Sequence, residues 1–221
     1  MTSALRFCGT ASVFRPLTQH QGGNRNVGQL GVRIALCCAL ITVFSFIVLV
    51  APSVEAGELR LETLSLRAGF SGVRVIGDNQ PDYFNQFDVA VTARLPWEKE
   101  FGTGWVLGTR VLASAGVLSG AQETPGIFTL VPFYVFFGRK DGLISIDMGV
   151  GGALVTDYKF DGQNFGGPFQ FVWTFGVTSR FAGPFGAGYH FQHFSDAGMY
   201  GNDSRGVDLH LFDLIYWFDA K

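Results

Sequence analysis

Charged residues are scarce in this chain. Asp, Glu, Lys and Arg make up 15% of its 221 residues, against about 25% in an ordinary soluble domain. The formal net charge is only −2, so no basic surface of the kind that binds nucleic acid is present, and we expect no nucleic-acid partner. Phenylalanine and glycine are abundant instead, with 23 and 30 residues. This composition favours a protein that contacts lipid.

Cysteine is also rare, and its placement excludes several kinds of chemistry. The chain has three cysteines, Cys8, Cys37 and Cys38. From residue 39 onward there is none. That part of the chain therefore has no disulfide, no thiol nucleophile and no zinc–thiolate site.

Long apolar runs are missing except for one near the N-terminus. It covers residues 34–50, follows Arg33 and precedes Val54-Glu55-Ala56. A basic residue, an apolar run and a small-residue site in this order predict a secretory signal cleaved after Ala56. We therefore expect a signal peptide over 1–56, with an overlong n-region, and one domain over 57–221. A retained membrane anchor is the competing interpretation.

The rest of the chain alternates with a period of two residues, which predicts β-strands. In 83–97, the odd positions carry mostly apolar side chains, whereas the even positions are mostly polar or small. Eight such segments follow one another, at 60–73, 83–97, 104–118, 127–138, 143–156, 168–181, 185–196 and 207–218. Their length and even number predict an all-β fold, an eight-stranded antiparallel transmembrane β-barrel of the outer-membrane type.

The connections between these segments alternate in length. Short turns at 139–142 and 182–186 would face the periplasm, and the longer, more polar connections would be extracellular. Trp97, Trp105 and Trp217 then fall at the periplasmic ends of strands, where an aromatic girdle is expected. Charged residues such as Asp88 and Arg94 share the opposite face from the aromatics, so we expect them to pair inside the barrel.

A polar cluster in "GYHFQHFSDAG" (188–198) is the main candidate site. Strand alternation divides it, because His190 and Gln192 share the inward face and His193 and Ser195 share the aromatic, lipid-facing one. Polar groups facing hydrocarbon cost free energy. A histidine and a serine two residues apart on one face can form a nucleophile–base pair. Asp208, near the start of the last strand, would hold the histidine.

The segment "FQHFSDAGMYGNDSRGVDLHLFDLIYWF" resembles the C-terminal motif of the lipid A 3-O-deacylases, the PagL-like outer-membrane enzymes. This resemblance implies a cofactor-free serine esterase in the bacterial outer membrane. It would hydrolyse the 3-O-linked acyl chain of lipid A at a site facing the outer leaflet. Ser195 would be the nucleophile, His193 the base and Asp208 the acid. Lipopolysaccharide and membrane lipid would be its partners. Whether the protein forms a homodimer stays open.

Two residues depart from the family's pattern. Asp196 stands where the family has an oxyanion-hole Asn, and Asp208 stands where its best-known members have Glu. An ionised carboxylate at Asp196 would repel the oxyanion, and losing one donor can cost about 100- to 1000-fold in rate. The oxyanion hole is therefore assigned to the segment Asp196, Ala197 and Gly198, with the last two contributing backbone N–H groups.

Three other interpretations stay open. A non-catalytic barrel (an adhesin, a small pore or a degenerate family member) would have no use for Ser195. A calcium-dependent outer-membrane phospholipase would use a similar His and Ser, but is larger. A metal site from His190, His193, His210 and Asp196 would need side chains from opposite strand faces, so we expect no metal and no other cofactor.

Overall fold

The computed structural model describes residues 59–72, 75–76, 83–160, 162–201 and 206–218. The predicted signal segment, 1–56, lies outside these described residues. Within the described ranges, no helix combines the length and hydropathy needed to cross a bilayer.

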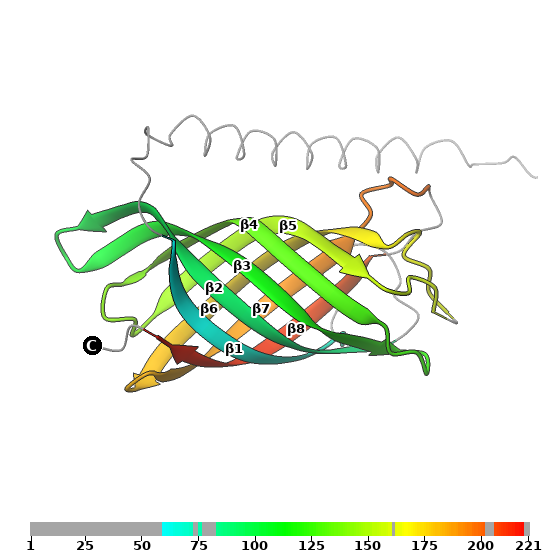
Figure 1. The fold of residues 1–221 in the computed structure, drawn as a ribbon, viewed down its shortest axis with the longest axis horizontal. Helices are drawn as coiled ribbons and strands as arrows, with labels where there is room; N and C mark the ends of the chain where they lie inside the picture. Colours follow the sequence, from blue (N-terminus) through cyan, green and yellow to red (C-terminus); the bar gives the residue numbers. More distant parts are fainter. Residues whose placement is uncertain (1–58, 73–74, 77–82, 161, 202–205, 219–221) are drawn as a thin grey trace, which may run out of the picture. The chain divides into compact units, whose positions relative to one another are not determined.

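Eight strands form a closed antiparallel barrel (Figure 1). They are β1 (Arg60–Phe70), β2 (Phe84–Phe101), β3 (Trp105–Gly120), β4 (Gly126–Arg139), β5 (Ser145–Val155), β6 (Phe169–Ala182), β7 (Phe185–Ser195) and β8 (Val207–Trp217). Each strand pairs with the next, and β8 returns to pair with β1. The closing register places Thr63 opposite Trp217 and Phe70 opposite His210. The predicted fold is confirmed.

The largest difference from the prediction lies at the end of β2. The sequence pattern ends this strand at Trp97, but the strand continues to Phe101. The pairing with β3 shifts register between Arg94 and Glu98. Pro96 has no N–H to give to a strand ladder, and a bulge accommodates such a residue without ending the strand. The alternation is lost there, which explains why the sequence pattern stops too early.

The two faces of each strand differ as the alternation predicts. In β2, Gln86, Asp88 and Thr92 are buried, whereas Phe87 and Val89 are exposed. The polar side chains therefore point into the barrel and the apolar ones point out of it. This is the reverse of a soluble protein, and it suits a barrel wall that faces hydrocarbon.

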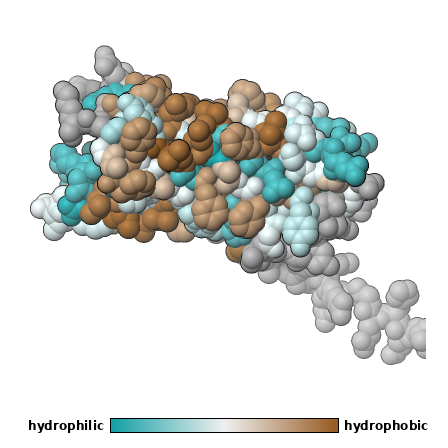
Figure 2. Space-filling view, turned by 90° about the horizontal axis from the view of Figure 1, so that it is seen from below, coloured by the Kyte–Doolittle hydropathy of each residue, from teal (hydrophilic) through white to brown (hydrophobic). Residues whose placement is uncertain are grey.

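The outer wall is correspondingly apolar. Figure 2 shows hydrophobic side chains over much of the middle of the barrel, and hydrophilic ones toward its ends. Large apolar side chains that are exposed come from every strand; examples are Leu66, Phe128, Met148, Phe175 and Leu214. A soluble monomer rarely exposes so many together. The wall is therefore a surface for lipid.

Ion pairs fill much of the interior. Arg67 Nε lies 2.6 Å from Asp88 Oδ1, and Arg67 Nη2 donates to Ser114 Oγ at 2.9 Å. Nearer to the end that carries the β2–β3 and β4–β5 turns, Glu62 pairs with both Arg94 and Arg110. The expected pairing of interior charges is confirmed, although Asp88 and Arg94 each pair with other residues and not with one another.

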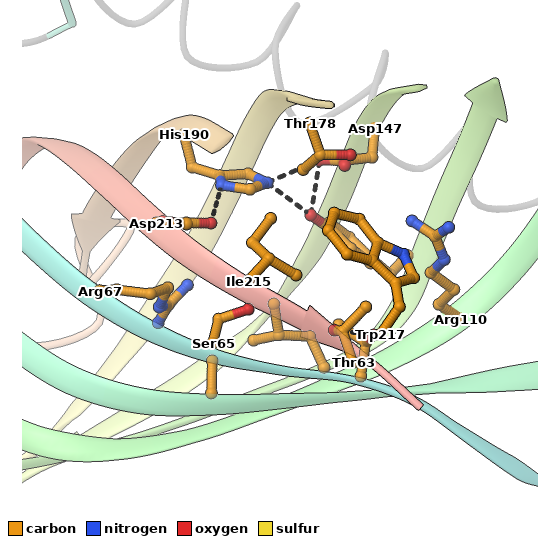
Figure 3. A pocket seen from close by; sticks show the side chains of 14 residues that line it. Thr63, Ser65, Arg67, Arg110, Asp147, Thr178, His190, Asp213, Ile215 and Trp217 are labelled. Carbon is orange, nitrogen blue, oxygen red and sulfur yellow. Dashed lines mark hydrogen bonds and ion pairs between the residues drawn. The ribbon is translucent and has the colours of Figure 1, made fainter. Parts of the chain in front are cut away.

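His190 lies between two carboxylates inside the barrel (Figure 3). Its Nε2 is 3.0 Å from Asp147 Oδ1, and its Nδ1 is 2.6 Å from Asp213 Oδ2. Tyr134 Oη lies 3.0 Å from the same Nε2. Both ring nitrogens lie within ion-pair distance of a carboxylate, an arrangement that favours the protonated, cationic ring. The inward position expected for His190 is confirmed.

Each ion-paired carboxylate buried in the described interior has a cationic partner, and the partly exposed Arg94 also pairs with Glu98. The carboxylates are Glu62, Asp88, Asp147 and Asp213, and their cationic partners are Arg67, Arg94, Arg110 and His190. His190 is thus the fourth cation beside three guanidinium groups. A small cavity of about 30 Å³ beside it (Figure 3) has room for only one or two waters.

Apolar side chains close the interior at the opposite end, which carries the β1–β2, β3–β4, β5–β6 and β7–β8 connections and is here termed the long-loop end. We name Phe84, Phe160 and Phe165 the aromatic plug, because their ring centroids lie 4.8 to 5.6 Å apart and all three rings are buried. Phe160 and Phe165 come from the β5–β6 connection. The described interior is therefore packed from end to end, which does not fit a small pore.

The pairing of His190 with two carboxylates predicts the effect of removing this side chain. Replacing His190 with Leu leaves the buried carboxylates of Asp147 and Asp213 without their shared partner. This should lower the free energy of unfolding by about 3 to 5 kcal/mol. Denaturant unfolding of the refolded barrel in detergent measures this. Gln192→Leu is the matched control, because Gln192 is uncharged and faces inward from the same strand. Equal losses for the two variants would contradict the ion-pair argument.

Candidate active site

The β7 strand places the two halves of the predicted polar cluster on opposite sides of the wall. His190 and Gln192 are buried in the interior, and Phe194 packs into the apolar core at the long-loop end. His193 and Ser195 alternate with them, are partly exposed, and lie on the outer face. The separation predicted from strand alternation is therefore present in the structure.

His193 is held by Asp208 from the neighbouring strand. The two residues are directly paired between β7 and β8, and His193 Nδ1 lies 2.6 Å from Asp208 Oδ1. The imidazole is 16% exposed and the carboxylate 1%. A hydrogen bond at Nδ1 fixes the ring orientation and the tautomer. It leaves Nε2, on the other side of the ring, to act as a base.

The second carboxylate oxygen of Asp208 is held by the β1–β2 connection. Asp208 Oδ2 accepts hydrogen bonds from the backbone N–H groups of Val75 and Ile76, both at 2.7 Å. Three hydrogen bonds from described residues thus fix a carboxylate that lies on the outer face. These two donors could not be predicted from the sequence, because backbone N–H groups leave no residue pattern that could reveal them.

Ser195 lies at the end of β7, opposite Phe171 of β6. Among the contacts of the described residues, none joins Ser195 Oγ to the His193 ring within hydrogen-bond distance. The two side chains share one face and lie two residues apart, so rotation of either can bring them together. Catalytic hydrogen bonds are often long before substrate binds.

The backbone of Gly206 lies close to both residues. A β-carbon at this position would lie 3.2 Å from His193 Cε1, 3.3 Å from Ser195 Cβ and 2.4 Å from the Phe194 carbonyl oxygen. The last distance is shorter than any real contact, so only glycine fits here without a shift. The backbone before β8 is therefore part of the surface that shapes the His193–Ser195 pair.

Asp196 holds the turn that follows β7. Its Oδ1 accepts from the Gly198 N–H at 3.0 Å and its Oδ2 from the Tyr200 N–H at 2.9 Å. The Gly198 N–H, an oxyanion donor predicted from the sequence, is thus bound to Asp196 in this arrangement. Ala197 has a φ of 52°, an unfavourable value for a residue with a β-carbon, and backbone strain of this kind clusters at functional sites.

Aromatic rings border the site on the outer face. Trp173 lies opposite His193, and its ring centroid is 5.8 Å from that of Phe191. His210 covers Phe191 from the other side at 5.7 Å, and its Nδ1 is 2.6 Å from Tyr189 Oη. Phe191 is only 6% exposed although it faces outward. The site therefore opens on an aromatic surface suited to lipid.

These positions do not bring the histidines together around one ion. His190 is paired with carboxylates inside the barrel, and His193 and His210 lie outside it. Within the described ranges, no group of three or more His, Cys, Asp or Glu side chains is arranged to hold a metal. What the outer face does offer is a hydroxyl, an oriented imidazole and a buried acid, which is the set needed for acyl transfer.

Comparisons with known proteins identify the family and the fold. The sequence model of the family described as lipid A 3-O-deacylase (PagL) matches residues 85–217. The solved structure titled "Crystal structure of the outer membrane enzyme PagL" superposes with a TM-score of 0.57 and 17% identity, over 70% of this chain and 98% of that one. The outer membrane protein Ail of Yersinia pestis gives a TM-score of 0.38 and 12% identity, over 71% and 99% of the two chains. No curated protein sequence matches. Because the family match covers more than half of the chain, this protein belongs to the lipid A 3-O-deacylase (PagL) family.

Proposed function

We propose that this protein is an outer-membrane serine esterase that removes the 3-O-linked acyl chain of lipid A. The observation that carries the proposal is the 2.6 Å contact between His193 Nδ1 and Asp208 Oδ1 on the outer wall. It lies beside Ser195 on the same strand face. Family membership supports lipid A as the substrate.

In the first half of the reaction, Ser195 Oγ attacks the carbonyl carbon of the ester and its proton passes to His193 Nε2. The carbonyl oxygen becomes an oxyanion. When the tetrahedral intermediate collapses, the bond to the sugar oxygen breaks and that oxygen takes the proton from His193. Asp208 stabilises the imidazolium that forms between these steps. The products are an acyl-Ser195 and a free sugar hydroxyl.

In the second half, water attacks the acyl-Ser195 and gives its proton to His193. Collapse restores the Ser195 hydroxyl and releases a fatty acid, so the net reaction consumes one water. No step needs a redox cofactor. The Ala197 N–H is the donor we assign to the oxyanion, since no described residue accepts a hydrogen bond from it and the Gly198 N–H is bound to Asp196.

The outer wall around Ser195 supports the proposal that the substrate reaches the site from the membrane. Phe171 lies opposite Ser195 and is 43% exposed, so the scissile ester can reach the hydroxyl with its acyl chain in hydrocarbon. Longer connections mark the extracellular side of such barrels, and the site is at the long-loop end. We therefore place it at the outer leaflet, where lipid A lies.

The proposal predicts a change in lipid A that depends on one hydroxyl. Ser195→Ala should lower the hydrolysis rate by about 10⁴- to 10⁶-fold, because it removes the nucleophile. Mass spectrometry of lipid A from cells that express each variant measures this as retention of one acyl chain. Ser179→Ala is the control, because Ser179 is a serine of β6 that bonds the Leu143 carbonyl at the opposite end of the barrel.

Loss of the acyl chain in the Ser195→Ala cells would contradict the proposal, and so would full acylation in cells that express the folded wild type. Chelation of calcium should leave hydrolysis unchanged. A requirement for calcium, together with release of lysophospholipid, would favour a phospholipase instead.

The negative charge of Asp196 is expected to slow the wild-type reaction. Asp196→Asn removes a negative charge next to the developing oxyanion, and its amide oxygen can still hold one N–H of the turn. We expect kcat to rise, by up to about 1000-fold if the charge acts as strongly as a missing donor. Steady-state kinetics in detergent measure this, with Asp141→Asn in the exposed β4–β5 turn as the control for net charge. A lower kcat would show that holding the turn outweighs the charge.

A further inference from the structure

The β5–β6 connection enters the barrel mouth as a small hairpin. Phe165 N donates to Tyr158 O at 2.9 Å, and Phe160 and Gln163 exchange backbone hydrogen bonds. Lys159 and Asn164 form a bridge between these pairs and are exposed. The side chains of Tyr158, Phe160, Gln163 and Phe165 therefore share the face that points inward. Gln163 is the polar residue among three aromatics.

Gln163 uses its amide to hold the strand that carries the acid. The side chain is 2% exposed, and its Nε2 donates to the Gly206 carbonyl oxygen at 3.0 Å. Gly206 immediately precedes β8 and lies two residues before Asp208. The contact therefore links the β5–β6 connection to the β7–β8 hairpin, from the interior side of the wall.

Gly206 transmits this contact to the reacting groups. A β-carbon built on Gly206 would lie 3.2 Å from His193 Cε1 and 3.3 Å from Ser195 Cβ, so the glycine backbone lies close to both side chains. Cε1 is the ring atom between Nδ1, which faces Asp208, and Nε2, which must face Ser195. A shift of the Gly206 backbone would therefore tilt the imidazole relative to the hydroxyl.

We propose that Gln163 is a positioning residue for the His193–Ser195 pair, acting through the Gly206 carbonyl. The inference rests on the proposed function for its kinetic consequence. If the aromatic plug needed only filling, an apolar side chain would serve at position 163 without the desolvation cost of a buried amide. The amide instead fixes a glycine that lies beside the His193 ring and two residues before the acid, Asp208.

A pair of matched variants separates positioning from stability. Gln163→Met keeps the length of the side chain, which lies among aromatic rings, and removes its N–H donor. Gln170→Met makes the same change at a glutamine that is 1% exposed and donates to the Phe165, Gly167 and Phe169 carbonyls, all outside the β7–β8 hairpin. Both should lose stability, and only the first should disturb the site.

The experiment uses the full barrel refolded in detergent with lipid A as substrate. Gln163→Met should lower kcat about 10- to 100-fold, because small displacements of catalytic groups have effects of this size. KM should stay within about twofold, because contacts with the bound lipid are unchanged. The ¹⁵N signals of the His193 ring, assigned with His193→Gln, should broaden or shift in Gln163→Met and stay as in the wild type in Gln170→Met.

Wild-type kcat and ring signals in Gln163→Met would overturn the inference. Equal effects of the two variants on kcat and on the ring would overturn it as well, because they would indicate general destabilisation. If the wild type hydrolyses lipid A no faster than Ser195→Ala, the proposed function fails. The His193 ring signals then still decide whether Gln163 positions the imidazole.

Discussion

Alternation of side chains across a one-layer wall is the constraint on which the rest of this structure depends. Neighbouring residues of a strand must point to opposite sides, and here one side is a packed polar interior and the other faces lipid. The strand residues of a site on the outer wall must therefore lie two apart on one strand or be paired across strands. His193 and Ser195 satisfy the first condition, and His193 and Asp208 satisfy the second.

The same constraint makes polar groups on the outer wall expensive, and the barrel shields them from its own side. Asp208 points to the lipid side but is almost fully covered, because the Val75 and Ile76 N–H groups and the His193 ring surround its carboxylate. His210 is paired with Tyr189 and covered by aromatic rings. Hydrogen bonds supplied by the protein replace those that hydrocarbon cannot give.

Strand alternation was enough to predict the barrel, the inward position of His190, the outward position of His193 and Ser195, and the pairing of His193 with Asp208. Each of these follows from periodicity and antiparallel register, which the sequence carries directly. The contacts of Val75, Ile76 and Gln163 could not be predicted, because they are made to backbone atoms or arise from the folding of a connection into the barrel mouth. The use of the Gly198 N–H by Asp196 is another case, since a turn's hydrogen bonds depend on dihedral angles that side-chain patterns do not specify.

The central claim is that Ser195 is a nucleophile activated by His193 on the outer wall. Covalent labelling of the detergent-solubilised barrel with a fluorophosphonate tests it most directly, because the probe forms a phosphonyl ester with an activated serine and releases fluoride. Peptide mass spectrometry should locate the adduct on Ser195, and His193→Ala should abolish its formation while the barrel stays folded. An unlabelled wild type, an adduct on another serine, or unchanged labelling in His193→Ala would contradict the account.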